Sequence, residues 1–380
     1  ATVLVVARLG GAAAQGSFAQ TKAWIDLLVV LGCFGFPQGI VYVTNKLGAS
    51  AHRLAWHSVA DSLAFLPVSW AITFLGTTKG WTGQTFNNGG VYIFASALAG
   101  ALLVLHGLLR GVYLSRQQGA SFALFSILPA ITLLVAIFIT RGKGYYANQI
   151  LVSAFVSAIF GVVLTVVQLR CMPVCYAETP WRALFANSTH SFVQSMLMVL
   201  QPLLSYALLR AADDYTQVGY LNAGIFLSQG LIVPVGLISP LMFAHWTSRY
   251  DAGLLWRLRR QTIRWVMLGI PASLFLAIIA QRVTPLIFGR DYLVASTAVA
   301  LMVCSVPQAL HSRLLAPALH AQGFPGVNTI CAGVRLAGLA LFGWLLSQSG
   351  VSALNAAALG WSVGELLSLA WVLWMMHRLD

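Results

Sequence analysis

The stretch GVYIFASALAGALLVLHGLLRG (residues 90–111) decides the class of fold. It is apolar over about 20 residues, the length that an α-helix needs to cross the hydrocarbon core of a bilayer. Two basic side chains, His106 and Arg110, interrupt it four residues apart, so on a helix they share one face. Ionisable side chains within a membrane generally face a polar cavity or a partner. The pair therefore indicates that this helix does more than anchor the chain.

The same apolar character extends over the whole chain. Of its 380 residues, 59% are hydrophobic and only 8% are charged, with a mean hydropathy of +0.81. Soluble domains carry roughly 25% charged residues, so we expect an all-α polytopic membrane protein. The apolar runs predict about twelve transmembrane helices, of which residues 1–9 supply only the end of a partial first helix. The other spans are expected at 17–43, 52–76, 90–115, 120–140, 146–169, 188–210, 217–244, 262–282, 292–320, 324–347 and 351–376.

Landmark residues recur along the chain at a nearly constant offset, which predicts an internal repeat. An even number of spans separates the copies, so the two halves point the same way across the membrane. We expect two pseudo-symmetric six-helix lobes around a central cavity, with cargo at their interface. The predicted parts are an N-lobe at 1–170, a cytoplasmic linker at 171–187 and a C-lobe at 188–380. The recurring landmarks are Gly16, Pro37 and Lys46 with Gly219, Pro240 and Arg249, YIFAS (92–96) with YLVAS (292–296), Gln118-Gly119 with Gln322-Gly323, and VSA (152–154) with VSA (351–353).

The chain is strongly basic, with 22 Lys and Arg against 9 Asp and Glu and a net charge of +13. The basic residues are scattered among apolar segments, so we expect anionic headgroups or an anionic cargo as partners and no nucleic acid. If the partial first helix runs outward, the loops on the cytoplasmic side hold more Lys and Arg than the other side. The run RYDAGLLWRLRRQTIR (249–264) carries most of this bias. It is typical of a basic amphipathic helix on the membrane surface, and the alternative is a solvated basic loop.

Several ionisable side chains fall inside the predicted spans, and cations outnumber carboxylates among them. This excess favours a cavity that receives an anion, but structural alternatives remain open. Lys22 with Asp26 and Arg335 with Glu365 could each form a self-neutralised pair, Arg110 could reach the headgroups, and His106 and His311 could be core histidines. The candidate substrate-binding cations are Arg8, Lys22, Arg110, Arg313 and Arg335, and the candidate ion-coupling carboxylates are Asp26, Asp61 and Glu365.

Sequence signatures of catalysis are missing. There is no GxxxxGK[ST], HExxH or CxxC motif, and no long outer loop to hold an active site. The CxxxC pair Cys171 and Cys175 has no nearby histidine, so ordinary reduced thiols are favoured over a metal site. We therefore expect no catalytic residues, no metal and no cofactor other than a transmembrane proton or sodium gradient.

Four segments resemble the multidrug/oligosaccharidyl-lipid/polysaccharide (MOP) exporters, specifically the Wzx-type polysaccharide flippases. The segments are ARLGGAAAQGSFA (7–19), GFPQGIVYVTNK (35–46), VGYLNAGIFLSQGLIVPVGLISPLMFAHWTSRY (218–250) and LIFGRDYLVAS (286–296). The first departs from the family pattern, because a proline is replaced and the spacing differs, and most of helix one is absent, as in an N-terminally truncated member. The resemblance implies twelve helices in two lobes and a cation-lined cavity.

The resemblance also implies a function in the bacterial inner membrane. Such proteins move an undecaprenyl-diphosphate-linked oligosaccharide from the cytoplasmic to the periplasmic leaflet by alternating access, coupled to an ion gradient. The partners implied are that lipid-linked oligosaccharide, membrane lipids and the polysaccharide polymerase machinery. The alternatives are a MATE-like drug or cation antiporter, a lipid II flippase and, from another class, a membrane-embedded polysaccharide polymerase or ligase.

Overall fold

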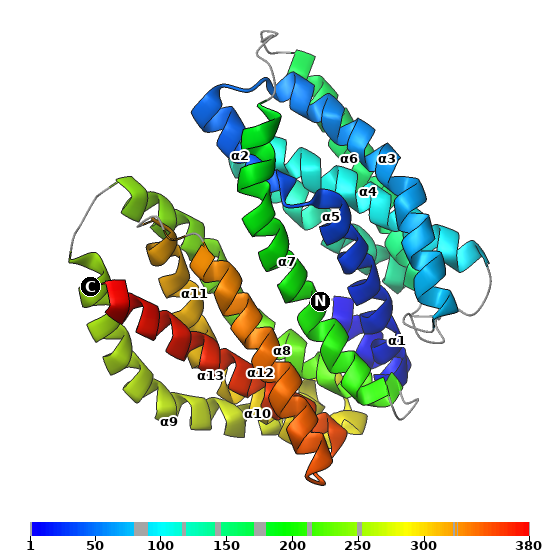
Figure 1. Ribbon diagram of the computed structural model, residues 1–380. Coiled ribbons are helices and arrows are strands. Elements are labelled where there is room, and N and C mark those ends of the chain that lie inside the picture. The colour runs from blue at the N-terminus through cyan, green and yellow to red at the C-terminus, as the bar shows by residue number, and fades with distance from the viewer. Residues whose placement is uncertain are drawn as a thin grey trace. The chain divides into compact units, whose positions relative to one another are not determined.

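The computed structural model describes residues 2–79, 90–115, 119–140, 146–170, 180–210, 215–248, 253–321, 324 and 326–379. Within these ranges all regular structure is helical (Figure 1), so the predicted all-α class is confirmed. In the part of the chain that the structure describes, ten segments are long and apolar enough to cross a membrane, and Ala123–Ile139 is a shorter apolar helix. Large apolar side chains point outward, for example Leu286 at 72% exposure and Phe138 at 70%. An apolar exterior is what a lipid environment requires.

The chain divides into two compact units. The first comprises Ala1–Leu9 and Ser17–Val199, and the second comprises Gly10–Gly16 and Leu200–Asp380. This division differs from the predicted lobe boundaries, because α7 contributes to both units. The first unit holds most of α1 (Thr2–Cys33), then α2 (Phe36–Leu47), α3 (Ala51–Thr78), α4 (Gly90–Ser115), α5 (Gly119–Ile139), α6 (Tyr146–Arg170) and the first part of α7 (Trp181–Arg210).

The second unit continues with the remaining elements. It holds the rest of α7, then α8 (Tyr215–Ser248), α9 (Leu254–Phe288), the 3-10 helix η2 (Arg290–Leu293), α10 (Ser296–Cys304), α11 (Val306–Ala321), α12 (Gly326–Gln348) and α13 (Ala353–Leu379). The predicted span 292–320 is thus two consecutive helices, α10 and α11, which are separated at Ser305. Pro307 contributes to this break, because it has no N–H to donate to a preceding turn.

Glycines interrupt the first long apolar segment twice. Gly11 has a φ of 73°, so α1 bends after the short stretch that the sequence predicted as the end of a helix. Between α1 and α2, Phe34 has a φ of 44° and Gly35 a φ of 70°. Gly35 adopts this left-handed conformation without the steric cost that a Cβ would bring. The predicted span 17–43 is therefore two helices, and Pro37 lies in the first turn of the second, where its missing N–H is harmless.

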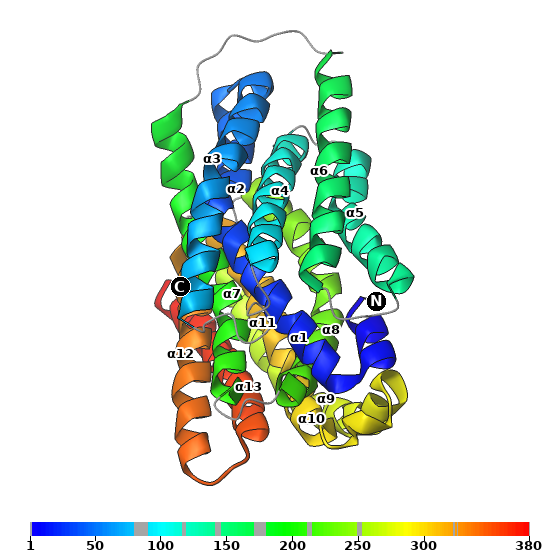
Figure 2. The same cartoon turned by 90° about the vertical axis from the view of Figure 1, so that its right-hand side faces the viewer.

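Helix α4, which contains the stretch that opened the sequence, is buried on two faces. It packs against α3 and α6 and lies between them (Figure 2), and it also packs against α2. Val104 and Leu108 belong to one apolar cluster with Ile40, while Leu109 belongs to another with Phe125. This burial explains why the sequence there is apolar all round rather than amphipathic.

Hydroxyl side chains in this apolar setting hydrogen bond to helix backbone. Ser69 Oγ donates to the Ala97 carbonyl oxygen at 3.0 Å and so joins α3 to α4. In the second unit, Ser362 Oγ donates to the Leu301 carbonyl oxygen at 2.7 Å and joins α13 to α10. Buried hydroxyls need such partners, because no water is available in the hydrocarbon region.

Two regions that were predicted between spans differ in part from the expectation. Residues 171–179 of the predicted linker lie outside the described residues, but residues 181–187 are the first turns of α7, which begins directly after Pro180. These turns are too polar for a hydropathy window yet carry no helix breaker. The predicted separate amphipathic helix at 249–264 is, from Leu254 onward, the start of α9, which continues without a break into the span. A basic sequence alone does not end a helix, and residues 254–264 contain no glycine or proline.

Candidate functional site

Among the described residues, the most deeply buried charged side chains lie where α12 and α13 pack together (Figure 1). Small residues bring the two backbones close. A Cβ on Gly364 would lie 2.5 Å from the Arg335 carbonyl oxygen, and a Cβ on Gly360 would lie 2.8 Å from the Gly343 nitrogen. Gly360 and Gly364 are four residues apart, the small-xxx-small spacing that lets membrane helices approach closely. The approach sets Glu365, the next residue on α13, beside Arg335.

Glu365 is shared by two arginines. Its Oε2 lies 2.9 Å from Arg335 Nε, and its Oε1 lies 3.5 Å from Arg313 Nη2 on α11. The carboxylate is 1% exposed and the Arg335 side chain 7%, whereas the Arg313 side chain is 21% exposed. The sequence-based expectation that Arg335 pairs with Glu365 is therefore confirmed. We call Arg313, Arg335 and Glu365 the charge cluster.

Two polar residues complete the surroundings of the charge cluster. Arg313 Nη1 donates to Gln229 Oε1 on α8 at 3.2 Å, and Arg335 Nη2 donates to Ser368 Oγ at 3.4 Å. The two ion pairs are close, but neither is aligned as a hydrogen bond in the described structure. Two guanidinium groups and one carboxylate leave one excess positive charge, and a charge in a membrane interior costs about 2.5–3.5 kcal/mol on insertion scales. A bound anion would neutralise this excess charge.

Lys22 and Asp26 form the predicted pair on α1. Lys22 Nζ lies 2.5 Å from Asp26 Oδ2, and the two side chains are 45% and 42% exposed on the protein surface. Exposed pairs contribute about 0–1 kcal/mol to stability. The pair is accessible, unlike the charge cluster, so either member can exchange its partner at low cost to the fold.

The other candidates of the first unit lie in different environments. Arg8 and Arg110 are exposed. His106 is 6% exposed, and its ring stacks on Phe125 at 4.1 Å between centroids with an interplanar angle of 4°. His106 thus has the surroundings of a core histidine, although Arg110 follows one turn later. Asp61 is half-buried on α3, one turn after His57. The His57 ring packs on Trp181, with 4.8 Å between the ring centroids.

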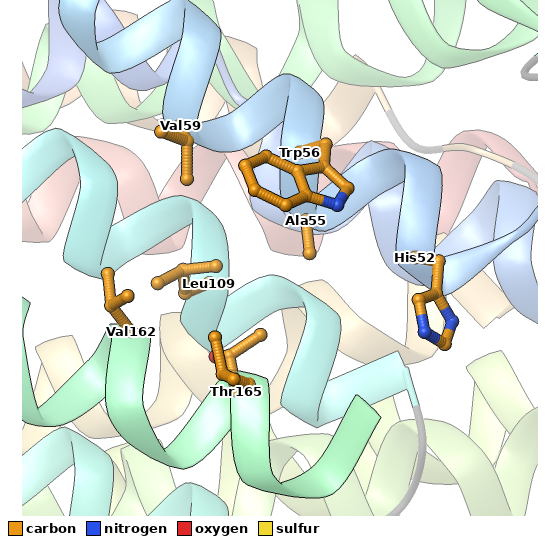
Figure 3. Close-up of a pocket in the computed structure, with 8 residues that line it drawn as sticks. His52, Ala55, Trp56, Val59, Leu109, Val162 and Thr165 are labelled. Carbon is orange, nitrogen blue, oxygen red and sulfur yellow. The ribbon is translucent and has the colours of Figure 1, made fainter. Parts of the chain in front are cut away.

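A cavity of about 210 Å³ lies between α3, α4 and α6 (Figure 3). Its walls are almost entirely apolar, with Val59 and Trp56 from α3, Leu109 from α4 and Val162 from α6. The polar groups among the lining side chains are the His52 ring at one end, the Trp56 indole N–H and the Thr165 hydroxyl, which accepts a hydrogen bond from Tyr113 at 3.2 Å. This lining suits hydrocarbon rather than a charged group.

Nothing in the described ranges resembles a metal site. No group of three His, Cys, Asp or Glu residues gathers there. Cys33, Cys304 and Cys331 are free thiols, and the predicted pair Cys171 and Cys175 lies outside the described residues. The expectation of reduced thiols stays a prediction for that pair.

Sequence reasoning missed three parts of the charge cluster's environment. Gln229 and Ser368 are uncharged, and the sequence does not distinguish them from the many other polar residues in the predicted spans. The Gly360-x-x-x-Gly364 spacing was a readable signal, because it marks where α13 approaches another helix. Arg313 was identified as an interior cation, but its sharing of Glu365 depends on how α11 packs against α13.

Comparison with protein-family models and with curated proteins gives no match. Solved structures do match over nearly the whole chain. An inward-facing multidrug resistance MATE family transporter of the MOP superfamily is 16% identical, covers 100% of this chain and 93% of its own, and gives a TM-score of 0.69. The lipid II flippase MurJ in an inward closed conformation is 12% identical, covers 99% and 84%, and gives a TM-score of 0.75. The Vibrio cholerae MATE transporter VcmN in its bent form is 15% identical, covers 99% and 91%, and gives a TM-score of 0.62.

The class of fold is given by these matches. The chain has the two-lobed helical fold of these MATE transporters and of MurJ. At 12–16% identity the likeness establishes the fold, whereas the cargo depends on the chain's own residues.

Proposed function

We propose that this protein is a flippase for an undecaprenyl-diphosphate-linked oligosaccharide, such as an O-antigen or other polysaccharide repeat unit. It moves this lipid from the cytoplasmic to the periplasmic leaflet of the bacterial inner membrane by alternating access. It performs no covalent chemistry, and an ion gradient drives the cycle. Its partners are the lipid-linked oligosaccharide, the surrounding lipids and the polysaccharide polymerase machinery that consumes the product.

The observation that carries this proposal is the excess positive charge of the charge cluster. The fold is one that solved transporters and a lipid II flippase use, and within it two arginines share one buried carboxylate. A diphosphate is a strong acceptor for arginine donors. Arg8, Lys22 and Arg110 add further exposed cations on the membrane-spanning helices.

Two related functions compete. A MATE-like antiporter for cationic drugs would place carboxylates where the cargo binds, whereas here the buried carboxylate is outnumbered by arginines. A lipid II flippase has a specific observation in its favour, the TM-score of 0.75 with MurJ. Its cargo is also a lipid-linked diphosphate sugar, so the charge cluster does not separate the two. A membrane-embedded polymerase or ligase has less support, because the chain offers no long outer loop for catalysis.

Ion coupling is assigned to the exposed pair of the first unit. An ion-driven carrier needs a group whose occupancy differs between its two states. Asp26 is accessible and holds Lys22 at 2.5 Å, and an anionic cargo that attracts Lys22 would leave Asp26 ready to take a proton or sodium ion. Asp61 is a second candidate, and Glu365 is already committed to two arginines.

Complementation tests the proposal and separates its competitors. The chain is expressed in three strains, one lacking its polysaccharide flippase, one depleted of its lipid II flippase and one lacking drug efflux. Restored surface polysaccharide in the first strain alone supports the proposal. Rescue of growth in the second strain alone identifies a lipid II flippase, and drug resistance alone identifies an antiporter. Membrane abundance is measured in each strain, so that a poorly inserted chain is recognised.

A further inference from the structure

We propose that Arg313 exchanges Glu365 for a phosphate group of the cargo, and that Glu365 acts as an internal competitor that limits how tightly the anion binds. In this scheme Arg335 holds Glu365 in place and partly neutralises it, so that Glu365 competes less strongly with the phosphate for Arg313. The identity of the cargo rests on the proposed function, whereas the competition is a property of these three side chains.

The two arginines are held unequally. Arg335 lies 2.9 Å from Glu365, donates to Ser368 and is 7% exposed. Arg313 lies 3.5 Å from Glu365 and is 21% exposed. Coulomb attraction weakens with distance and with access to water, so Arg313 is the member that can leave at lower cost. Arg335 keeps the carboxylate neutralised when it does.

Arg313 also has unused hydrogen-bonding capacity. Only its Nη1 makes a hydrogen bond, to Gln229, whereas its Nε and Nη2 are buried atoms with no such partner in the described structure. A guanidinium presents its donors in a fixed fork that matches two oxygens of a phosphate. Nε and Nη2 form one edge of that fork. Glu365 lies 3.5 Å from Nη2 but is not aligned with it as a hydrogen-bond acceptor, so it does not satisfy this edge.

The competition makes opposite predictions for changes at Glu365 and at Arg335. Removing the charge of Glu365 releases Arg313 and raises the net charge of the cluster, so an anion binds more tightly. Removing the charge of Arg335 leaves Glu365 with Arg313 as its one arginine, so an anion binds more weakly. A cluster that only stabilises the fold predicts no such opposition, because both changes would then act through stability alone.

The test measures binding of inorganic diphosphate to the purified full chain in lipid nanodiscs by titration calorimetry at constant ionic strength. Glu365→Gln is expected to lower the dissociation constant at least about tenfold, the lower end of the coupling measured between close charge pairs. Arg335→Gln is expected to raise it, and Arg313→Gln to abolish saturable binding. Arg264→Gln on α9, an exposed arginine outside the charge cluster, is the control for general basicity and should bind as the unchanged protein does.

A second variant covers the case in which the single changes prevent folding. Arg335→Met/Glu365→Met removes the buried pair together, which is often neutral for stability, and leaves Arg313 without its competitor. Tighter diphosphate binding by this double variant supports the exchange. Equal or weaker binding overturns it, as does any shift of Glu365→Gln and Arg335→Gln in the same direction, or an unchanged protein that does not bind diphosphate. Any of these results beside successful polysaccharide complementation rejects the exchange but leaves the proposed function standing.

Discussion

Gly16 on α1 and Gly219 on α8 pack against each other's helix backbone so closely that neither position has room for a Cβ. A Cβ on Gly16 would lie 1.9 Å from the Tyr215 carbonyl oxygen, and a Cβ on Gly219 would lie 1.9 Å from the Ala12 carbonyl oxygen. Ala12 and Tyr215 are separated by 203 residues, as are the two glycines. The contact is thus reciprocal, as expected where two copies of a repeat meet around a local two-fold axis. All four residues belong to the second unit or to its segment Gly10–Gly16.

We predict that Gly16→Ala and Gly219→Ala each strongly lower the amount of folded protein. An alanine in an exposed helix gains about 1 kcal/mol over glycine, but the atoms it meets here are backbone carbonyls that cannot turn away, and overpacking costs about 1–3 kcal/mol or more. Membrane abundance and the unfolding midpoint in detergent are the measurements. Gly230→Ala on α8, whose Cβ would meet nothing within 4 Å, is the control. Equal stability of all three variants would contradict the close backbone contact between Gly16 and Gly219.

Gly364→Ala is predicted to loosen the α12–α13 contact and, with it, the charge cluster. The added methyl group would lie 2.5 Å from the Arg335 carbonyl oxygen, so the helices must separate and the Arg335–Glu365 distance must increase. A lower unfolding midpoint is expected. Gly326→Ala, at the open start of α12, should leave the midpoint unchanged, and an unchanged midpoint for Gly364→Ala itself would show that the helices do not pack as described.

Glu365→Gln is predicted to lower membrane abundance. Breaking a buried ion pair by removing one partner costs about 3–5 kcal/mol, because the other charge remains buried without compensation. Here two guanidinium groups are left. Quantitative immunoblotting of the membrane fraction measures the loss, and normal abundance would mean that other groups neutralise the arginines.

Asp26→Asn is predicted to stop polysaccharide delivery while the protein remains at normal abundance. Since an exposed pair contributes at most about 1 kcal/mol, its loss should not unfold the chain. A defect in transport would therefore report on ion coupling. Complementation of a flippase-null strain, with membrane abundance measured in parallel, is the test. Full polysaccharide display by Asp26→Asn would reject its coupling role.

The two basic residues of α4 are predicted to respond differently to substitution. His106→Phe should keep delivery, because the phenylalanine can stack on Phe125 as the imidazole does. Arg110→Gln should lower delivery, since Arg110 is exposed and is assigned to cargo binding. The same complementation assay compares them, and a defect in His106→Phe with normal Arg110→Gln would reverse the assignment.

Much of the fold could be predicted from the sequence, because lipid exposure demands long apolar helices. The spans and the Arg335–Glu365 pair followed from hydropathy and from depth along two successive helices. The breaks at Gly11 and Gly35 did not follow, since glycine is also common within membrane helices and only the packing shows which one adopts a positive φ.

The full charge cluster also lay beyond sequence reasoning. Arg313 and Glu365 are far apart along the chain, and their contact requires α11 to pack on α13. Gln229 joins from α8, a third non-adjacent helix. The sequence indicated an excess of interior cations, whereas the sharing of one carboxylate between two arginines is a consequence of tertiary packing.

The most direct test of the proposed function is translocation by the purified protein. The chain is reconstituted into proteoliposomes with a fluorescent undecaprenyl-diphosphate-linked oligosaccharide, an ion gradient is imposed, and the lipid exposed on each leaflet is quantified with a membrane-impermeant quencher. We predict gradient-dependent movement between leaflets that Arg313→Gln and Asp26→Asn abolish. The absence of movement above protein-free liposomes, with the chain folded and a gradient present, would contradict the account.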